Sequence, residues 1–266
     1  MELLLLLAGG LLTLSLLGGR PGSRARAVEH GARRVRTEMD AVYGGEHRYQ
    51  RCEPGQFPEA DLAPYQAGER ELHALGFRTI ADVEDLTLSE VYPAMRTFTR
   101  VLVDDAGLIR AGIYHLRPRG MMLGMLQLVR MVPRELRVIE LVTEVPRGRF
   151  VVTANTAGLD LLDHGPAVAL ERVSQATPAV RLVERHRARL TELVRKRADA
   201  SPVAVTRYED VITSLQRGNV VAAMHRKGLR GLSRDELERM KGRPLEPGDE
   251  EFLRAIQDHG GAAKGG

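Results

Sequence analysis

Acidic and imidazole side chains follow the last strand that the sequence predicts, and they are the first candidates for chemistry. Asp160, Asp163 and His164 lie just before Gly165 and Pro166. Carboxylates beside an imidazole can bind a metal ion or move protons. The alternative is a turn in which the aspartate side chains accept hydrogen bonds from backbone amides.

Two further groups carry reactive or polar side chains. Thr153 and Asn155 come at the end of a predicted strand, where they either hydrogen-bond a ligand at the sheet edge or simply end the strand. His47, Cys52 and Glu53 lie close together in an irregular segment. A thiol beside an imidazole can be a nucleophile. The alternative is that this lone cysteine is inert.

Common catalytic and cofactor signatures are absent from the sequence. It has no Walker loop, no G-x-G-x-x-G after a strand, no H-E-x-x-H and no G-x-S-x-G. A single cysteine excludes an internal disulfide and the usual cysteine-based zinc site. We therefore predict no cofactor and no metal, and we assign no catalytic residue.

Five short runs rich in β-branched residues predict the strands that would position these side chains. The runs are Phe77–Val83, Thr97–Val103, Ile109–Leu116, Arg137–Val145 and Phe150–Ala154. Residues 104–107 and 146–149 are typical of hairpin turns. Successive hairpins predict an antiparallel meander, which needs helices to cover one face.

Helical patterns flank this sheet region. Residues 65–75 predict a helix that stops at Gly76, and the chain after Pro178 is helical. Thr206-x-x-Glu209 and Ser233-x-x-Glu236 are typical of capping boxes, and a last helix begins at Pro247. The predicted fold is α+β: an antiparallel four- to five-stranded meander sheet packed by helices, with a helical C-terminal extension and a single N-terminal transmembrane helix.

The N-terminal run Leu3–Leu17 is almost wholly apolar and is followed by six arginines between Arg20 and Arg36. With two further glycines the run has about seventeen residues, the lower limit for a membrane span. The positive-inside tendency then predicts a signal anchor with a cytoplasmic body, its arginines near anionic headgroups. The alternative is a signal peptide cleaved near Ala27, followed by export.

We divide the chain into an anchor (1–19), a basic juxtamembrane stalk and irregular linker (20–64), an α+β domain (65–200), a helical extension (201–259) and a disordered tail (260–266). The 266 residues are 43% apolar and 28% charged, which is typical of a globular protein. Most of the net charge of +4 comes from the arginines after the apolar run. A nearly neutral body argues against specific nucleic-acid binding.

A methionine-rich segment separates the third and fourth predicted strands. It contains Met121, Met122, Met125 and Met131. Methionine fills irregular gaps, so the segment is either part of the core, as a lid helix, or an adaptable contact surface for an apolar ligand, a partner or the membrane.

Several short stretches carry a resemblance. They are Leu75–Phe77, Arg100–Val103, Glu140–Glu144, Val152–Asn155 and Glu184–His186. Over about residues 65–195 the chain resembles uncharacterised bacterial proteins with a small antiparallel meander sheet flanked by helices. The resemblance implies this fold and supplies no activity and no catalytic residue.

We expect a membrane-anchored, non-catalytic module that binds a small apolar ligand or a protein partner. Its contact surface would be the open face of the sheet, the methionine-rich segment or the C-terminal helices. The alternative is an enzyme, for example a hydrolase, that uses the loop with Asp160, Asp163 and His164 or the region around Cys52.

Overall fold

The computed structural model describes residues 21–93, 96–116, 135–157, 162–197 and 199–259. These residues form two compact units. Of the described residues, those between 47 and 157 and between 164 and 221 form the α+β unit, and residues 21–46, 162–163 and 222–259 form the helical unit. Each unit has its own hydrophobic core.

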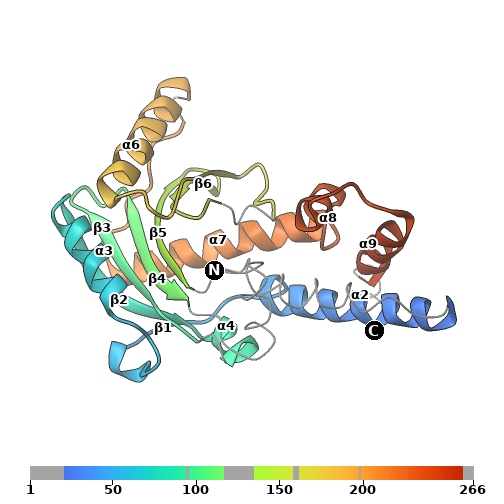
Figure 1. Ribbon diagram of the computed structural model, residues 1–266. Coiled ribbons are helices and arrows are strands. Elements are labelled where there is room, and N and C mark those ends of the chain that lie inside the picture. Colours follow the sequence, from blue (N-terminus) through green and yellow to red (C-terminus); the bar gives the residue numbers. More distant parts are fainter. Residues whose placement is uncertain (1–20, 94–95, 117–134, 158–161, 198, 260–266) are drawn as a thin grey trace. The chain divides into compact units, whose positions relative to one another are not determined.

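A seven-stranded sheet forms the α+β unit (Figure 1). In spatial order the strands are β1 (Tyr49–Arg51), β2 (Phe77–Asp85), β3 (Thr99–Asp104), β4 (Arg110–Leu116), β5 (Leu136–Val145), β6 (Arg149–Ala154) and β7 (Val168–Arg172). Neighbouring strands from β1 to β6 are antiparallel, and β7 pairs with β6 in parallel. The sheet is therefore mixed.

This topology corrects the predicted four- to five-stranded antiparallel sheet. The five predicted runs do form β2 to β6, but the sheet gains a strand at each edge. β1 has three residues, too few for a visible alternation. β7 is mostly half-buried and pairs with β6 in parallel. A parallel pair is not joined by a hairpin turn, so the sequence contains no turn signal that predicts β7. The formation of β1 and β7 therefore depends on the strands that they pair with and not on an alternating pattern in their own sequences.

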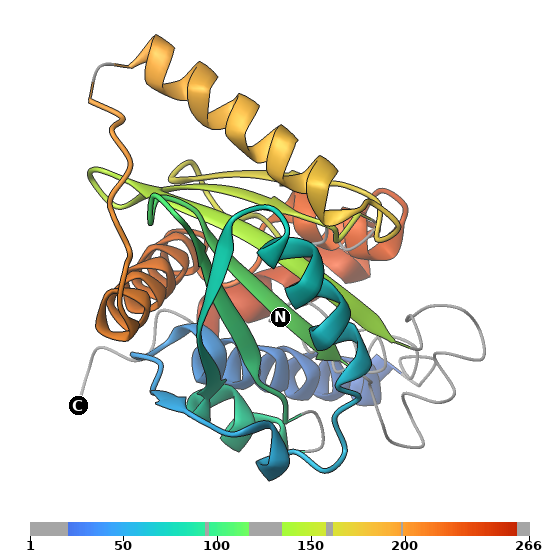
Figure 2. The same cartoon turned by 90° about the vertical axis from the view of Figure 1, so that its left-hand side faces the viewer.

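Helices cover both faces of the sheet (Figure 2). α3 (Ala63–His73) and α6 (Ala179–Lys196) pack on one face, where Leu102, Ile113 and Leu141 point into the core. The other face, which we call the α7 face, carries Val101 and Val103 of β3. Residues 208–221 of α7 (Tyr208–Gly228) pack over it. Alternation along each strand thus separates two distinct layers.

The start of α7 differs in detail from the predicted capping box. Asp210 accepts hydrogen bonds from the backbone amides of Thr206 and Arg207, at 3.0 Å each. These bonds lower the pKa of Asp210 to about 2. The α+β unit also contains a short 3-10 helix (Pro54–Gln56) and the short helix α4 (Leu86–Val91).

The helical unit brings the two ends of the described chain together. Its helices are α2 (Pro21–Tyr43), α8 (Arg234–Lys241) and α9 (Pro247–His259), and residues 222–228 of α7 also belong to it. Ser233 and Glu236 form the predicted capping box at the start of α8, and Gly242 ends that helix with a φ of 64°. The buried residues of this core are Val28, Ala32, Val35, Met39, Leu162, Leu232, Leu237, Phe252, Leu253 and Ile256.

The helical unit contains most of the stretch that we assigned to a juxtamembrane stalk. The arginine-rich stretch lies in α2, whose apolar side packs on α9. Three of its arginines form ion pairs one turn along the same helix, Arg33 with Glu29, Arg34 with Glu38 and Arg36 with Asp40. The predicted cleavage site near Ala27 also lies inside this helix.

The expected single-pass membrane protein with a cytoplasmic body is contradicted as well. Across residues 21–259, as far as the structure describes them, no helix combines the length and the apolar character that a membrane span needs. The Leu3–Leu17 run that predicted the anchor lies outside the described residues. The membrane and signal-anchor assignments therefore have no structural support.

Candidate functional site

A buried arginine stands out on the α7 face of the sheet. Arg110, the first residue of β4, is 8% exposed. It pairs in register with Val103 of β3 and Val142 of β5. Both valines belong to apolar clusters that α7 contacts, so Arg110 is flanked by apolar side chains on both neighbouring strands.

The guanidinium of Arg110 lacks the partners that a buried charge normally has. Its Nε is buried and has no hydrogen-bond partner, and among the described residues no carboxylate lies within ion-pair distance. Burial lowers the pKa of Arg110, and the more distant charges of Glu140, Tyr49 and Glu144 offset this only in part. A buried, uncompensated charge is costly and therefore unusual.

Glu140 provides an opposite charge close to this arginine. It lies on β5, directly across from Gly112, and is diagonal to Arg110 on the same face. Because Gly112 has no side chain, the carboxylate of Glu140 meets no cross-strand partner from β4. Within the described chain Glu140 is half-buried and forms no ion pair. Arg110 and Glu140 are thus two complementary charges that are held apart.

Polar groups from β1, β5 and α7 surround this pair of charges. Asn219 of α7 donates a hydrogen bond to the hydroxyl oxygen of Tyr49 on β1, at 2.5 Å. Arg217 of α7 binds both carboxylate oxygens of Glu144, with Nε 2.6 Å from Oε1 and Nη2 2.9 Å from Oε2. The carboxylate of Glu144 is therefore already neutralised, whereas that of Glu140 is not.

A buried histidine–aspartate pair lies on the same face. Nδ1 of His47 is 2.6 Å from Oδ2 of Asp85, and the two side chains are 2% and 9% exposed. The second oxygen of Asp85 accepts a hydrogen bond from the amide of Leu88 and thereby caps α4. The His47 ring also stacks near Tyr49, with 6.2 Å between ring centroids. These bonds hold β1 and Tyr49 in place.

Two of the predicted ligand-binding residues, Thr153 and Asn155, are engaged on the α6 side of the sheet. Thr153 is fully buried beneath α6, and Asn155 ties three segments by accepting from the amide of Ile139 and donating to the carbonyls of Arg137 and Gln175. The burial of Thr153 and the hydrogen bonds of Asn155 both contribute to the packing of β6 and the residue that follows it. Neither side chain lies on the α7 face.

The predicted acidic loop is divided between the two units. Asp160 lies outside the described residues. Asp163 belongs to the helical unit, where its carboxylate is 2.9 Å from Nη2 of Arg239. His164 belongs to the α+β unit, where its Nε2 is 2.9 Å from Nη2 of Arg172. Each of the two described side chains is thus engaged with an arginine of its own unit.

Cys52 lies apart from His47. The cysteine is buried in the core on the α3 side, while His47 belongs to the α7 face. Burial and the carboxylates of Asp82 and Glu84 raise the pKa of Cys52 to about 12. The backbone amide of Glu53 donates a hydrogen bond to the side-chain oxygen of Gln56 at the start of the short 3-10 helix, and the charge of Glu53 also helps to raise the pKa of the thiol. A thiolate nucleophile is therefore disfavoured.

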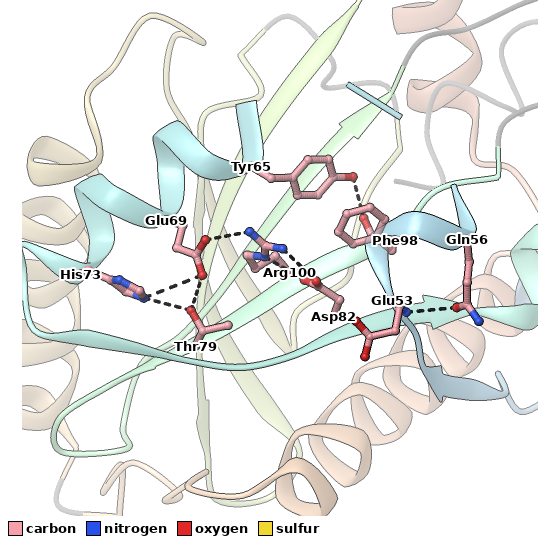
Figure 3. A network of polar contacts seen from close by, with 9 residues as sticks. All are labelled: Glu53, Gln56, Tyr65, Glu69, His73, Thr79, Asp82, Phe98 and Arg100. Carbon is pink, nitrogen blue, oxygen red and sulfur yellow. Dashed lines mark hydrogen bonds and ion pairs between the residues drawn. The ribbon is translucent and has the colours of Figure 1, made fainter. Parts of the chain in front are cut away.

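A polar network on the α3 side joins helix to sheet. Figure 3 shows Glu69 of α3, Arg100 of β3 and Asp82 of β2 pointing toward one another. Arg100 donates two hydrogen bonds to Asp82, at 2.9 and 2.8 Å, and one to Glu69, at 2.7 Å. The charges in this network are paired, so it fits a structural role.

The remaining predicted contact surface cannot be placed. Met121, Met122, Met125 and Met131 lie outside the described residues. In the part of the chain that the structure describes, no group of three or more metal-binding side chains is close enough to hold a metal ion.

Sequence reasoning missed Arg110 and Glu140. A signal was present, because Ile109–Leu116 is a strand pattern in which arginine occupies a position flanked by apolar residues. An unpaired charge in an otherwise apolar strand is a candidate binding residue. The pattern cannot show which face a charged residue occupies or whether a partner reaches it.

Comparisons with known proteins add no assignment to this geometry. No protein-family model, no curated protein and no solved structure matches the chain.

Proposed function

We propose that the α+β unit is a non-catalytic binding module that takes a small ligand on the α7 face of its sheet, with an anionic group bound by Arg110. The observation that carries the proposal is the buried guanidinium without a hydrogen-bonded acceptor at Nε. An arginine fork binds carboxylate or phosphate through two parallel hydrogen bonds. A bound anion would supply the negative charge and the hydrogen-bond acceptor that the buried guanidinium of Arg110 lacks.

Rigid neighbours support a binding role for this position. Arg110 lies on a central strand that is paired on both sides, and the helix above it is anchored by the Glu144–Arg217 ion pair. Binding residues on such elements are held in place before the ligand arrives, which lowers the entropic cost of binding.

The enzyme alternative has less support from the geometry. It would need the loop around Asp163 and His164 or the thiol of Cys52. The two loop side chains each contact an arginine, and the thiol is buried with a raised pKa. Single substitution of Asp163, His164 or Cys52 is expected to leave anion binding at Arg110 unchanged.

Titration calorimetry on the full chain tests the proposal. The probes are acetate, butyrate and inorganic phosphate, and the test variant is Arg110→Met. We expect at least one probe to bind, with an affinity about tenfold lower or worse in the variant, because a charge-assisted hydrogen bond is lost.

A matched control is available on the neighbouring strand. Arg137 of β5 is 61% exposed and already paired with Glu135 at 2.6 Å. Arg137→Met removes the same charge and should leave binding unchanged. The proposal is wrong if none of the ionic probes binds at millimolar concentration, or if Arg110→Met and Arg137→Met weaken binding equally.

A further inference from the structure

We infer that the ligand is a small zwitterion, with its carboxylate on Arg110 and its ammonium group on Glu140. This inference rests on the proposed function and specifies the ligand class for the same site. It concerns the two complementary charges of Arg110 on β4 and Glu140 on β5. In the described structure these two side chains do not form an ion pair with each other.

Charge balance separates a zwitterion from a simple anion. Glu140 and Glu144 are the two carboxylates whose charges act on Arg110. Arg217 neutralises Glu144 through an ion pair that includes one hydrogen bond, but the described residues offer Glu140 no cation at ion-pair distance. A ligand with only negative charge would meet Arg110 and repulsion from Glu140. A ligand that also carries an ammonium group satisfies both.

Strand geometry places the two charges at a suitable separation. Arg110 pairs with Val142 and Glu140 pairs with Gly112, so the two side chains are diagonal neighbours on one face. Such diagonal residues are about 7–8 Å apart, and their Cβ atoms are somewhat closer. Arginine and glutamate side chains are long enough to bind the two ends of a small molecule beside Gly112. The methyl group of Thr99 lies 3.2 Å from the position that a Cβ of residue 112 would take, so it forms an apolar floor between the two charges.

The surrounding polar groups favour a compact ligand. The Tyr49 hydroxyl, which accepts a hydrogen bond from Asn219, is close enough to act on the charge of Arg110. Apolar residues of the α7 face, including Val103 and Val142, border the arginine on both sides. The ligand class is therefore an amino acid or a short ω-amino acid and not a large polyanion.

Matched probes measure the contribution of each charge. Glycine, β-alanine and 4-aminobutanoate carry both charges, acetate and butyrate carry only the carboxylate, and butylamine carries only the ammonium group. Titration calorimetry on the full chain should show at least one zwitterion binding about tenfold or more tightly than its carboxylate analogue, because a second charge-assisted contact forms.

Glu140→Gln is the decisive variant. It should lower the affinity for the zwitterion to that of the carboxylate analogue and leave the analogue's affinity unchanged or improved. The control is Glu184→Gln on α6, which removes an exposed carboxylate that is paired with Arg181. Circular dichroism of each variant checks that the fold is kept.

The outcomes distinguish the two proposals. Equal binding of zwitterions and carboxylates, both dependent on Arg110, overturns the zwitterion inference and leaves the anion site standing. Tighter binding of phosphate than of every zwitterion does the same. Absence of binding by all probes, or binding that is independent of Arg110, overturns both.

Discussion

Nδ1 of His186 lies 3.0 Å from the hydroxyl oxygen of Thr153 in the buried contact between α6 and the sheet. On the other side of the ring, Nε2 is 3.0 Å from the hydroxyl oxygen of Thr143, which donates to the carbonyl of Leu108. Arg189 donates to Thr153 at 2.7 Å. Hence Thr153 donates to Nδ1 and Nε2–H donates to Thr143, which assigns the neutral Nε2-protonated ring.

This neutral ring predicts a pH dependence of stability. Burial, and secondarily the charge of Arg189, lower the pKa of His186 from 6.5 to about 4. Above pH 6.5 the ring is neutral in the folded and the unfolded chain, so it has no effect. As pH falls from 6.5 toward 4, only the unfolded chain gains the proton, and folding loses roughly 3 kcal/mol.

Urea unfolding between pH 4 and 7.5 measures this loss. The control is His186→Gln, which keeps hydrogen-bonding groups but does not titrate. Its free energy of unfolding should fall less steeply than that of the unsubstituted protein over this range. Parallel curves for the two proteins would show that the histidine is not the titrating group.

Replacement of Arg110 is expected to stabilise the protein when no ligand is present. Arg110→Met removes a buried charge and keeps much of the side-chain volume, so the free energy of unfolding should rise by about 1–2 kcal/mol. Urea unfolding in a buffer free of small carboxylates and phosphate makes the measurement. A loss of stability would instead show that the guanidinium contributes to the apo fold.

The thiol of Cys52 should resist alkylation in the folded protein. It is the only cysteine of the chain, and burial with nearby carboxylates raises its pKa to about 12, so almost no thiolate exists near neutral pH. Mass spectrometry after iodoacetamide treatment at pH 8 should find little modification without urea and full modification in unfolding urea. Rapid labelling of the folded chain would contradict this burial.

A buried ion pair in the helical unit should matter more than its exposed neighbour. Nη2 of Arg226 is 2.6 Å from Oε1 of Glu236, and the side chains are 6% and 0% exposed. Although burial by itself raises the pKa of Glu236, Arg226 and two backbone amides lower it overall. Glu236→Gln leaves Arg226 uncompensated and should cost about 3 kcal/mol or more.

The exposed pair on the same helix is the control for that substitution. Glu238 pairs with Arg234 at 3.1 Å, with the two side chains 33% and 54% exposed. Glu238→Gln should change the free energy of unfolding by less than about 1 kcal/mol. Equal losses for the two variants, measured by urea unfolding, would refute the distinction between the buried and the exposed pair.

Local sequence patterns were sufficient to predict the central strands and several helix ends. β2 to β6 are long enough for β-branched alternation to show, and Gly107, with a φ of 67°, is the turn residue between β3 and β4. The Ser233–Glu236 capping box likewise depends on residues that are three positions apart. Such signals depend on close neighbours, so they survive without tertiary context.

Tertiary structure decided the features that depend on distant partners. β7 exists only through its parallel pairing with β6, and α2 is partly buried because α9 covers its apolar side. Asp163 and His164 are adjacent in the sequence, but their side chains contact two different arginines, Arg239 and Arg172. The incomplete pairing of Arg110 is of the same kind. Sequence shows that a charge is present, but burial and the distance to each opposite charge are determined by how the strands and α7 pack together.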